Sequence, residues 1–194
     1  MRYPISVSSN QQREVEVKLA VADPAGTLAG IQKLGFVEIA PRTLEINVIY
    51  DSPDGELRAR GELIRLRQVA GRTVMTYKGP CTVGRHKERE ELEVDVSSFE
   101  NMALIFNRLN LVPKFRYEKY RAEWQRPNEP GIIMVDEIPI GTYLELEGPG
   151  EWIDRTATEL GYQVSDYINL SYARLYAAHL ESAGSVPGDM VFSG

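Results

Sequence analysis

Apolar and polar residues alternate strictly along the stretch REVEVKLAV, residues 13–21. Side chains of a β-strand point to opposite faces in turn, so this pattern predicts a strand with one apolar and one charged face. Glu14, Glu16 and Lys18 share the charged face. Two like carboxylates side by side on one strand face repel each other. The stretch is therefore either a wet surface strand or part of a site that uses both carboxylates and the lysine.

The same period-two pattern returns along most of the chain and predicts a protein made mainly of strands. Turn sequences such as SPDG (52–55) and AGR (70–72) separate them, and the segment GPCTVGRHK (79–87) is predicted to be a loop. About eight strands in antiparallel order favour closure into a barrel. After the first strand, we expect strands at residues 36–52 (one long strand or a bent pair), 61–69, 73–79, 88–96, 114–126, 132–139 and 142–148.

Four segments instead place apolar residues three and four positions apart, which is typical of amphipathic helices. Asp23 and Pro24 start the first, and Gly35 ends it. The last is expected to begin at a cap formed by Ser165 or Asp166. With the strands, these helices indicate an α+β protein. The other three helices are expected within residues 97–110, 149–161 and 165–182.

Length and composition narrow the class of protein. A chain of 194 residues suits a single domain, which we place at residues 13–182, with polar, flexible tails at 1–12 and 183–194. The net charge of −6 gives no global basic surplus, so we expect no nucleic-acid partner. No apolar run is long enough to span a membrane, and we expect no signal peptide. The single cysteine, Cys81, excludes an intrachain disulfide and favours a cytoplasmic location.

The charged faces of the expected strands carry acids and bases in similar numbers. Taken one at a time, such faces are typical of the solvated side of an antiparallel sheet. Glu-x-Glu occurs on three of them, however, and neighbouring like charges are unfavourable without a cation between them. The acids are Glu14, Glu16, Glu91, Glu93, Asp136, Glu145 and Glu147, and the bases are Lys18, Arg65, Arg67, Lys78, Arg89, Lys119 and Arg121.

The amphipathic helices suggest which way these faces point. Helices cover the apolar face of a sheet, so helices outside a closed barrel would leave the charged faces to line its interior. Buried charges require compensation. Clustered carboxylates suit Mg²⁺ or Mn²⁺, whereas arginine and lysine suit phosphate oxygens. A divalent metal with a polyanion such as a triphosphate would satisfy both halves of this lining.

At these residues the sequence resembles the CYTH superfamily, also called the triphosphate tunnel metalloenzymes. The opening signature Glu-x-Glu-x-Lys is present as Glu14, Glu16 and Lys18. The ordered set of later motifs makes the resemblance much stronger than that short signature, and it extends over residues 13–180. FRYEKYR and DEIPIGTYLELEGP are most similar to the class IV adenylyl cyclase-like (CyaB-type) branch. The remaining motifs are RLR, YKGP, REELE and SYARLY.

The resemblance implies an eight-stranded antiparallel closed barrel, the triphosphate tunnel, with flanking helices and Mg²⁺- or Mn²⁺-dependent chemistry. It implies that Lys18 and Asp136 act in catalysis, and that Asp136 binds metal or orients a lysine or a metal-bound water. The role of Arg89 depends on the strand register, because a slip of one residue would turn its side chain outward. The implied metal ligands are Glu14, Glu16, Glu91, Glu93, Asp136, Glu145 and Glu147. The implied triphosphate-binding residues are Lys18, Arg65, Arg67, Lys78, Arg89, Lys119 and Arg121.

Three functions stay open on the sequence. The first is an adenylate cyclase that converts ATP to cyclic AMP and pyrophosphate. The second is a phosphohydrolase acting on inorganic triphosphate, thiamine triphosphate or a nucleoside triphosphate, and the third is a non-catalytic binding module for polyphosphate or nucleotide. Several triphosphatases of the family use a lysine from a C-terminal helix, whereas this chain has no lysine after Lys119. A homodimer is consistent with the resemblance.

Overall fold

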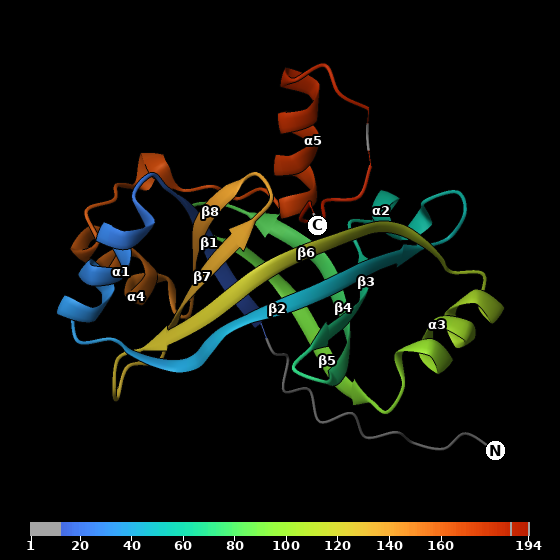
Figure 1. The fold of residues 1–194 in the computed structure, drawn as a ribbon, viewed down its shortest axis with the longest axis horizontal. Helices are drawn as coiled ribbons and strands as arrows, with labels where there is room; N and C mark the ends of the chain where they lie inside the picture. The colour runs from blue at the N-terminus through green and yellow to red at the C-terminus, as the bar shows by residue number, and fades with distance from the viewer. Residues whose placement is uncertain (1–12, 187, 194) are drawn as a thin grey trace.

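The computed structural model describes residues 13–186 and 188–193. Eight strands close into an antiparallel barrel in the order β1-β5-β4-β3-β2-β6-β7-β8, and β8 pairs back with β1. The expected α+β barrel is therefore confirmed (Figure 1). The strands are β1 (Arg13–Val21), β2 (Val37–Asp51), β3 (Leu63–Val69), β4 (Arg72–Val83), β5 (Lys87–Val96), β6 (Val112–Gln125), β7 (Ile132–Ile138) and β8 (Gly141–Glu147).

Within the described residues, five α-helices and one short 3-10 turn lie around this barrel. Figure 1 shows α1 and α4 together at one end of the long axis, α3 at the other end, and α5 projecting away from the strands. No helix within the described ranges is long and apolar enough to cross a membrane. The helices are α1 (Pro24–Lys33), α2 (Glu56–Ala59), α3 (Phe99–Arg108), α4 (Gly150–Glu159) and α5 (Tyr172–Ser182), and the turn η1 spans Val164–Asp166.

Side-chain caps fix where three of the helices begin. The Asp23 carboxylate accepts from the Gly26 amide at the start of α1, and Ser98 accepts from the Asn101 amide at the start of α3. The prediction for the last helix is wrong. It begins at Tyr172 behind a Ser171 cap, because residues 164–166 form a separate 3-10 turn and the chain then extends to 171.

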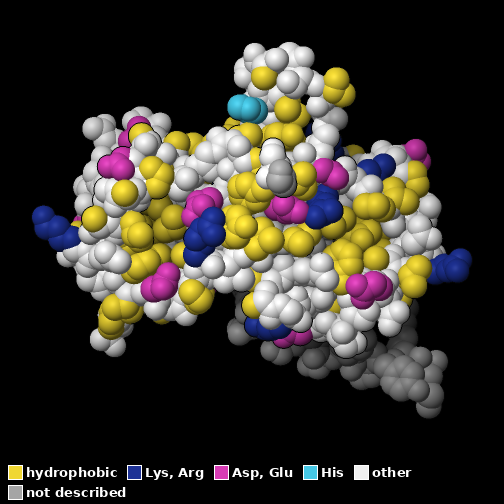
Figure 2. All heavy atoms as spheres, viewed as in Figure 1, with side chains coloured by type: hydrophobic (Ala, Val, Ile, Leu, Met, Phe, Trp, Pro, Cys, Tyr) yellow, Lys and Arg dark blue, Asp and Glu magenta, His cyan; other side chains and the backbone are white. Residues whose placement is uncertain are grey.

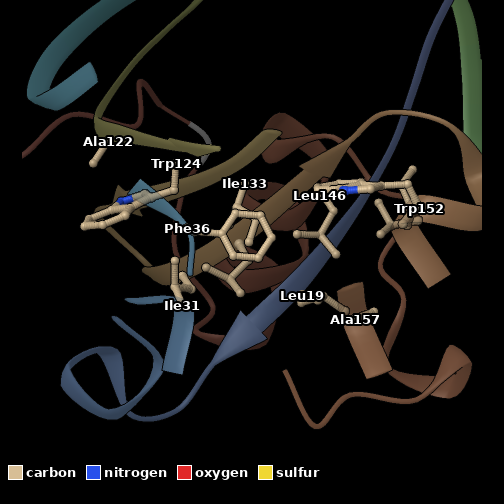
Figure 3. Packing of buried hydrophobic residues seen from close by; sticks show 12 residues of the cluster. Leu19, Ile31, Phe36, Ala122, Trp124, Ile133, Leu146, Trp152 and Ala157 are labelled. Atoms are coloured by element: carbon tan, nitrogen blue, oxygen red, sulfur yellow. The ribbon is translucent and has the colours of Figure 1, made fainter. Parts of the chain in front are cut away.

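The outer face of the barrel carries the main hydrophobic core. Apolar side chains of β1, β7 and β8 pack against α1 and α4, with Trp152 of α4 edge-on to Phe36 at 6.3 Å between ring centroids. Figure 3 shows this packing, and Figure 2 shows hydrophobic side chains gathered where β2 and β6 cross the surface. Val17 and Leu19, at most 1% exposed, belong to this core. Their alternation partners Glu14, Glu16 and Lys18 consequently point into the barrel.

The segment expected as a loop at residues 79–87 is mostly strand. β4 continues to Val83 and β5 starts at Lys87, so only residues 84–86 form the turn. The hairpin persists because a register shift between Lys78 and Cys81 absorbs Gly79 and Pro80 without ending the β4–β5 pairing.

The C-terminal segment is placed against β6, although its polar composition predicted a flexible tail. β6 extends past the end of β7, which leaves part of one β6 edge unpaired by a barrel strand. Met190 fills that edge, since its amide donates to the Arg116 carbonyl and its carbonyl accepts from the Glu118 amide, both at 2.9 Å. The Met190 side chain is fully buried beside Tyr117 and Tyr172. Residues 1–12, the other expected tail, lie outside the described residues.

Candidate active site

Charged side chains of the inward strand faces meet between strands that are not neighbours in the barrel. Lys78 of β4 reaches Glu14 of β1 at 2.6 Å, although β5 lies between these strands. Arg121 of β6 reaches Glu145 of β8 at 3.3 Å past β7. Such contacts require side chains that converge inside a closed barrel. The interior of the barrel is therefore lined by charged side chains that pair with each other. The alternation of apolar and charged residues along the strands predicted this lining.

An acidic cluster occupies the β1–β8 side of the interior. One carboxylate oxygen from each of Glu14, Glu16 and Glu145 lies within 4.8 Å of the other two, and all three residues are buried. Glu147 sits opposite Glu16 in the β1–β8 register. Burial, together with the like charges of Glu14 and Glu145, raises the pKa of Glu147 to about 8. We refer to these four residues as the acidic cluster.

The donor set of the acidic cluster fits a hard divalent cation. It offers several carboxylate oxygens converging at one place, which is the coordination that Mg²⁺ and Mn²⁺ favour. The raised pKa of Glu147 agrees with this, because burial and the like charges of Glu14 and Glu145 disfavour its ionised form, which a bound cation would stabilise. Glu14, Glu16, Glu145 and Glu147 are the residues that could hold such an ion.

Lys18 lies inside the acidic cluster. Its ammonium is 3.1 Å from Glu16 Oε1 and 3.2 Å from Glu145 Oε2. Burial alone would lower the pKa of Lys18, but Glu145 and Glu16 outweigh it and raise the pKa above its ordinary value. Lys18 is thus a permanent positive charge at the edge of the carboxylates and unsuited to act as a general base.

Two further lysines contact the acidic cluster from β4 and β5. The Lys78 ammonium bonds to Glu14 and to Glu91, the latter at 3.0 Å, and Lys87 donates to Glu16. Lys87 was not among the predicted site residues, because residues 79–87 were predicted to form a loop. The period-two spacing from Glu91 through Arg89 to Lys87 would have identified it.

A second group, which we call the basic cluster, lies on the β2–β3–β6 side. Its centre is Asp136 of β7, whose side chain is fully buried. Arg121 donates to both Asp136 oxygens at 2.6 Å, and Lys119 donates to Oδ2 at 3.1 Å. Burial would raise the pKa of Asp136, but Arg121 and Lys119 hold it below its usual range. The members of the basic cluster are Arg67, Lys119 and Arg121 with the carboxylates of Glu45 and Asp136.

Glu45 is an acid of the basic cluster that the sequence analysis did not select. It lies 3.4 Å from the Lys119 ammonium and 3.6 Å from Arg67. Burial opposes its ionisation, yet Lys119, Arg121 and Arg67 lower the pKa of Glu45 to about 2. The alternation of LEINVIY, with Leu44 and Ile46 outward, contains the signal that could have found it.

Tyr172 was also missed, and it closes the barrel over the basic cluster. As the first residue of α5, it is 6% exposed and donates its hydroxyl to Asp136 Oδ2 at 2.7 Å. Its ring centroid is 5.1 Å from the Lys18 ammonium and 5.7 Å from that of Lys119, positions at which cation–π attraction is favourable. The motif SYARLY, residues 171–176, contains Tyr172 and is the sequence signal that could have found it.

The remaining predicted residues occupy the β3–β5 side. Arg65 bonds to Thr76 and approaches Glu91 and Glu93 at 3.6 and 3.3 Å. Glu93 is exposed and lies with Arg65 and Arg67 rather than in the acidic cluster. Arg89 lies on the same face of β5 as Glu91 and Glu93. Its guanidinium, however, donates to the backbone carbonyls of Gly79 and Gly61.

One end of the interior opens into a cavity. Its volume is about 510 Å³, and Glu45, Arg67, Glu93 and Arg121 lie at its inner side. The rim mixes apolar side chains with an exposed pair, Arg72 and Asp95, in contact at 2.8 Å. At the opposite end, Tyr172, Met190 and their apolar neighbours pack together. The cavity is therefore the mouth through which a ligand could reach the charged interior.

Comparisons with known proteins agree with this geometry. The CYTH domain model matches residues 12–163. A protein of Methanocaldococcus jannaschii named "Putative adenylate cyclase" is 33% identical over 137 residues, which cover 69% of this chain and 75% of that protein.

Two solved structures share the fold. A "putative adenylate cyclase" from Vibrio parahaemolyticus has a TM-score of 0.76 at 17% identity, over 86% of this chain and 98% of that one. A "putative adenylyl cyclase" from Hippeastrum, described as having a dominant triphosphatase activity, has a TM-score of 0.61 at 14% identity. That match covers 90% of this chain and 97% of the other.

Proposed function

The chain belongs to the CYTH domain family, and on this premise we propose that it is a divalent-metal-dependent enzyme acting on a triphosphate. Its reaction is adenylate cyclase-like, converting ATP to cyclic AMP and pyrophosphate. Hydrolysis of a triphosphate is the second candidate. The observation that carries the proposal is the juxtaposition, inside one closed barrel, of the acidic cluster with buried bases.

The charge balance of the interior supports a ligand that brings both signs together. Without a ligand, carboxylates and bases compensate each other, as Lys78 does with Glu14 and Glu91. A metal–triphosphate complex offers a cation to the acids and an anion to the bases, so it can replace these ion pairs without leaving buried charge uncompensated. A pure anion-binding module would need only the bases.

The proposed metal ligands are Glu14, Glu16, Glu145 and Glu147. When bound, a divalent ion would neutralise phosphate charge and polarise the reacting phosphoryl group. Glu91 contacts Lys78 and Arg65, and Glu93 lines the cavity at the mouth. The residues proposed to hold the triphosphate are Lys18, Arg65, Arg67, Lys78, Lys87, Lys119 and Arg121.

Asp136 is proposed to position bases rather than to bind metal. Its two oxygens already accept from Arg121, Lys119 and Tyr172, and its lowered pKa makes it a poor proton acceptor. Fixed in this way, Lys119 and Arg121 would face phosphate oxygens without reorganisation, which is how preorganised charges stabilise a transition state. Lys18 would act as a fixed positive charge.

The two candidate reactions use the same lining and differ in the bond that forms. In cyclisation, the ribose 3′-oxygen bonds to the α-phosphorus and the bond to pyrophosphate breaks. In hydrolysis, a water oxygen bonds to the terminal phosphorus and the bond from that phosphorus to its bridging oxygen breaks. The terminal phosphoryl group becomes orthophosphate, and the leaving group is pyrophosphate from inorganic triphosphate or the diphosphate from a nucleoside or thiamine triphosphate. The name of the M. jannaschii relative favours the first. The activity ascribed to the Hippeastrum protein favours the second.

A product assay separates these reactions. The purified protein is incubated with ATP or inorganic triphosphate, in Mg²⁺, in Mn²⁺ or in EDTA, and the products are resolved by chromatography. Cyclic AMP with pyrophosphate identifies the cyclase, and orthophosphate identifies the hydrolase. Activity that persists undiminished in EDTA contradicts the metal requirement. Binding of either compound with no turnover identifies a binding module and overturns the proposed enzyme.

A further inference from the structure

Asn47 is a neutral side chain buried among the charges of the barrel. It lies on β2, it is 0% exposed, and neither its amide oxygen nor its amide nitrogen has a hydrogen-bond partner among the described residues. Buried side-chain amides in folded proteins normally have partners, and an unpaired one costs free energy. The residue therefore requires an explanation that the packing of the ligand-free protein does not give.

The strand register places Asn47 in the wall of the proposed phosphate site. It is opposite Arg67 of β3 on one side and opposite Tyr117 of β6 on the other. Glu45, two residues earlier on the same face, and Arg67 both line the cavity at the mouth. Asn47 thus lies one step farther in from the mouth, between a base proposed to bind phosphate and a tyrosine.

Thr76 shows that this interior can satisfy a neutral polar group. Thr76 is also 0% exposed, yet its hydroxyl donates to Glu93 at 2.7 Å and accepts from Arg65 at 3.1 Å. Of these two neutral side chains inside the barrel, Thr76 is therefore paired and Asn47 is not.

We infer that Asn47 is a ligand-binding residue for a group that combines a phosphate oxygen with an O–H. Its Nδ2 donates to the phosphate oxygen, and its Oδ1 accepts from the O–H. Ionised phosphate offers only acceptors, so it would satisfy only half of the amide. The O–H belongs either to a water bound beside the triphosphate or to a sugar hydroxyl of a nucleotide. This inference rests on the proposed function.

The test compares Asn47→Leu with the wild-type protein, because leucine keeps the approximate volume and removes both polar atoms. Calorimetry measures the dissociation constants of inorganic triphosphate and of ATP in Mg²⁺, and thermal unfolding is followed without ligand. We expect binding to weaken about ten- to a hundredfold, while the melting temperature of the ligand-free protein stays equal or rises. Thr76→Val, which removes a satisfied hydroxyl, is the matched control and should lower the melting temperature.

The two ligands distinguish the sources of the O–H. An equal loss for triphosphate and ATP identifies a bound water, and a larger loss for ATP identifies the sugar hydroxyl. Unchanged dissociation constants for both overturn the inference while leaving the proposed function intact. A lower melting temperature for both Asn47→Leu and Asn47→Ala also overturns it, because the amide would then be structural. Failure of the wild-type protein to bind either compound overturns the proposed function and the inference with it.

Discussion

Glu147 and Glu45 are both carboxylates on inward strand faces, and burial disfavours the charge of each. Their pKa values nevertheless lie on opposite sides of the ordinary value, about 8 for Glu147 and about 2 for Glu45. The difference comes from their neighbours. Glu147 faces the like charges of the acidic cluster, whereas Glu45 faces Lys119, Arg121 and Arg67.

The contrast shows that the interior is polarised rather than uniformly mixed. On the β1–β8 side, Glu147 has no ion-pair partner among the described residues and its pKa is raised. On the β2–β3–β6 side, Lys119 and Arg121 lower the pKa values of Glu45 and Asp136. A cation is therefore stabilised on one side and an anion on the other. This separation is more informative than the total charge, because balanced ion pairs scattered through a barrel would not orient a ligand.

Substitution of Glu16 breaks the acidic side most severely. Glu16→Gln removes one of three converging carboxylates, so we expect metal-dependent turnover to fall on the order of a thousandfold or more, and Glu14→Ala should act alike. Initial rates over a range of Mg²⁺ and Mn²⁺ concentrations measure the effect. Glu137→Gln is the control, since this carboxylate pairs with Arg42 on the outer surface and should leave the rate unchanged. Full turnover in both acidic-cluster variants would contradict the site.

Substitution of Asp136 breaks the basic side. Asp136→Asn leaves Arg121 and Lys119 without their shared anion in a buried setting, and we expect the free energy of unfolding to fall by about 3–5 kcal/mol. Urea denaturation measures this loss. Inorganic triphosphate should restore part of the stability, because it supplies the missing negative charge. An unfolding midpoint equal to that of the wild-type protein would show that Asp136 does not hold the basic cluster together.

The polarity of the interior was accessible from the sequence only in part. Alternation around Glu14, Arg65 and Glu145 predicted the strands and the inward direction of their charges. Their distribution between two sides was not predictable, because it depends on which strands become neighbours. β1 lies beside β5 and β8, and these pairings join residues more than 70 and 120 positions apart.

Residues contributed by irregular segments were the hardest to predict. Tyr172 enters the site because the chain between η1 and α5 is extended and its Ile168 pairs with the backbone of Lys18. Met190 is buried because β6 extends past the end of β7 and leaves an edge that residue 190 covers. Both placements depend on strand edges that remain open in the folded barrel, and nothing in the local pattern of either segment encodes the edge it meets.

The smallest expected effect is a gain in stability on substitution of Glu147. The direction of this effect tests the contrast between Glu147 and Glu45. In the unfolded chain the Glu147 carboxyl loses its proton near pH 4.5, but in the fold it keeps it until about pH 8. The contribution of Glu147 to the free energy of unfolding is therefore fully present below pH 4.5 and is lost as the pH rises to 8. Glu147→Gln escapes that decline, so in EDTA its advantage in melting temperature should grow by several degrees between pH 5 and 8.5.

Glu137→Gln should show the opposite dependence on pH. Arg42 lowers the pKa of Glu137, so removal of the Glu137 carboxylate should lower the melting temperature slightly more at pH 8.5 than at pH 5. Mg²⁺ should narrow the advantage of Glu147→Gln at pH 8.5, since the wild-type carboxylate then gains a cation. An advantage that does not change with pH would mean that Glu147 is ionised in the metal-free protein. The acidic cluster would then already contain enough positive charge, and the need for a metal would no longer follow from its composition.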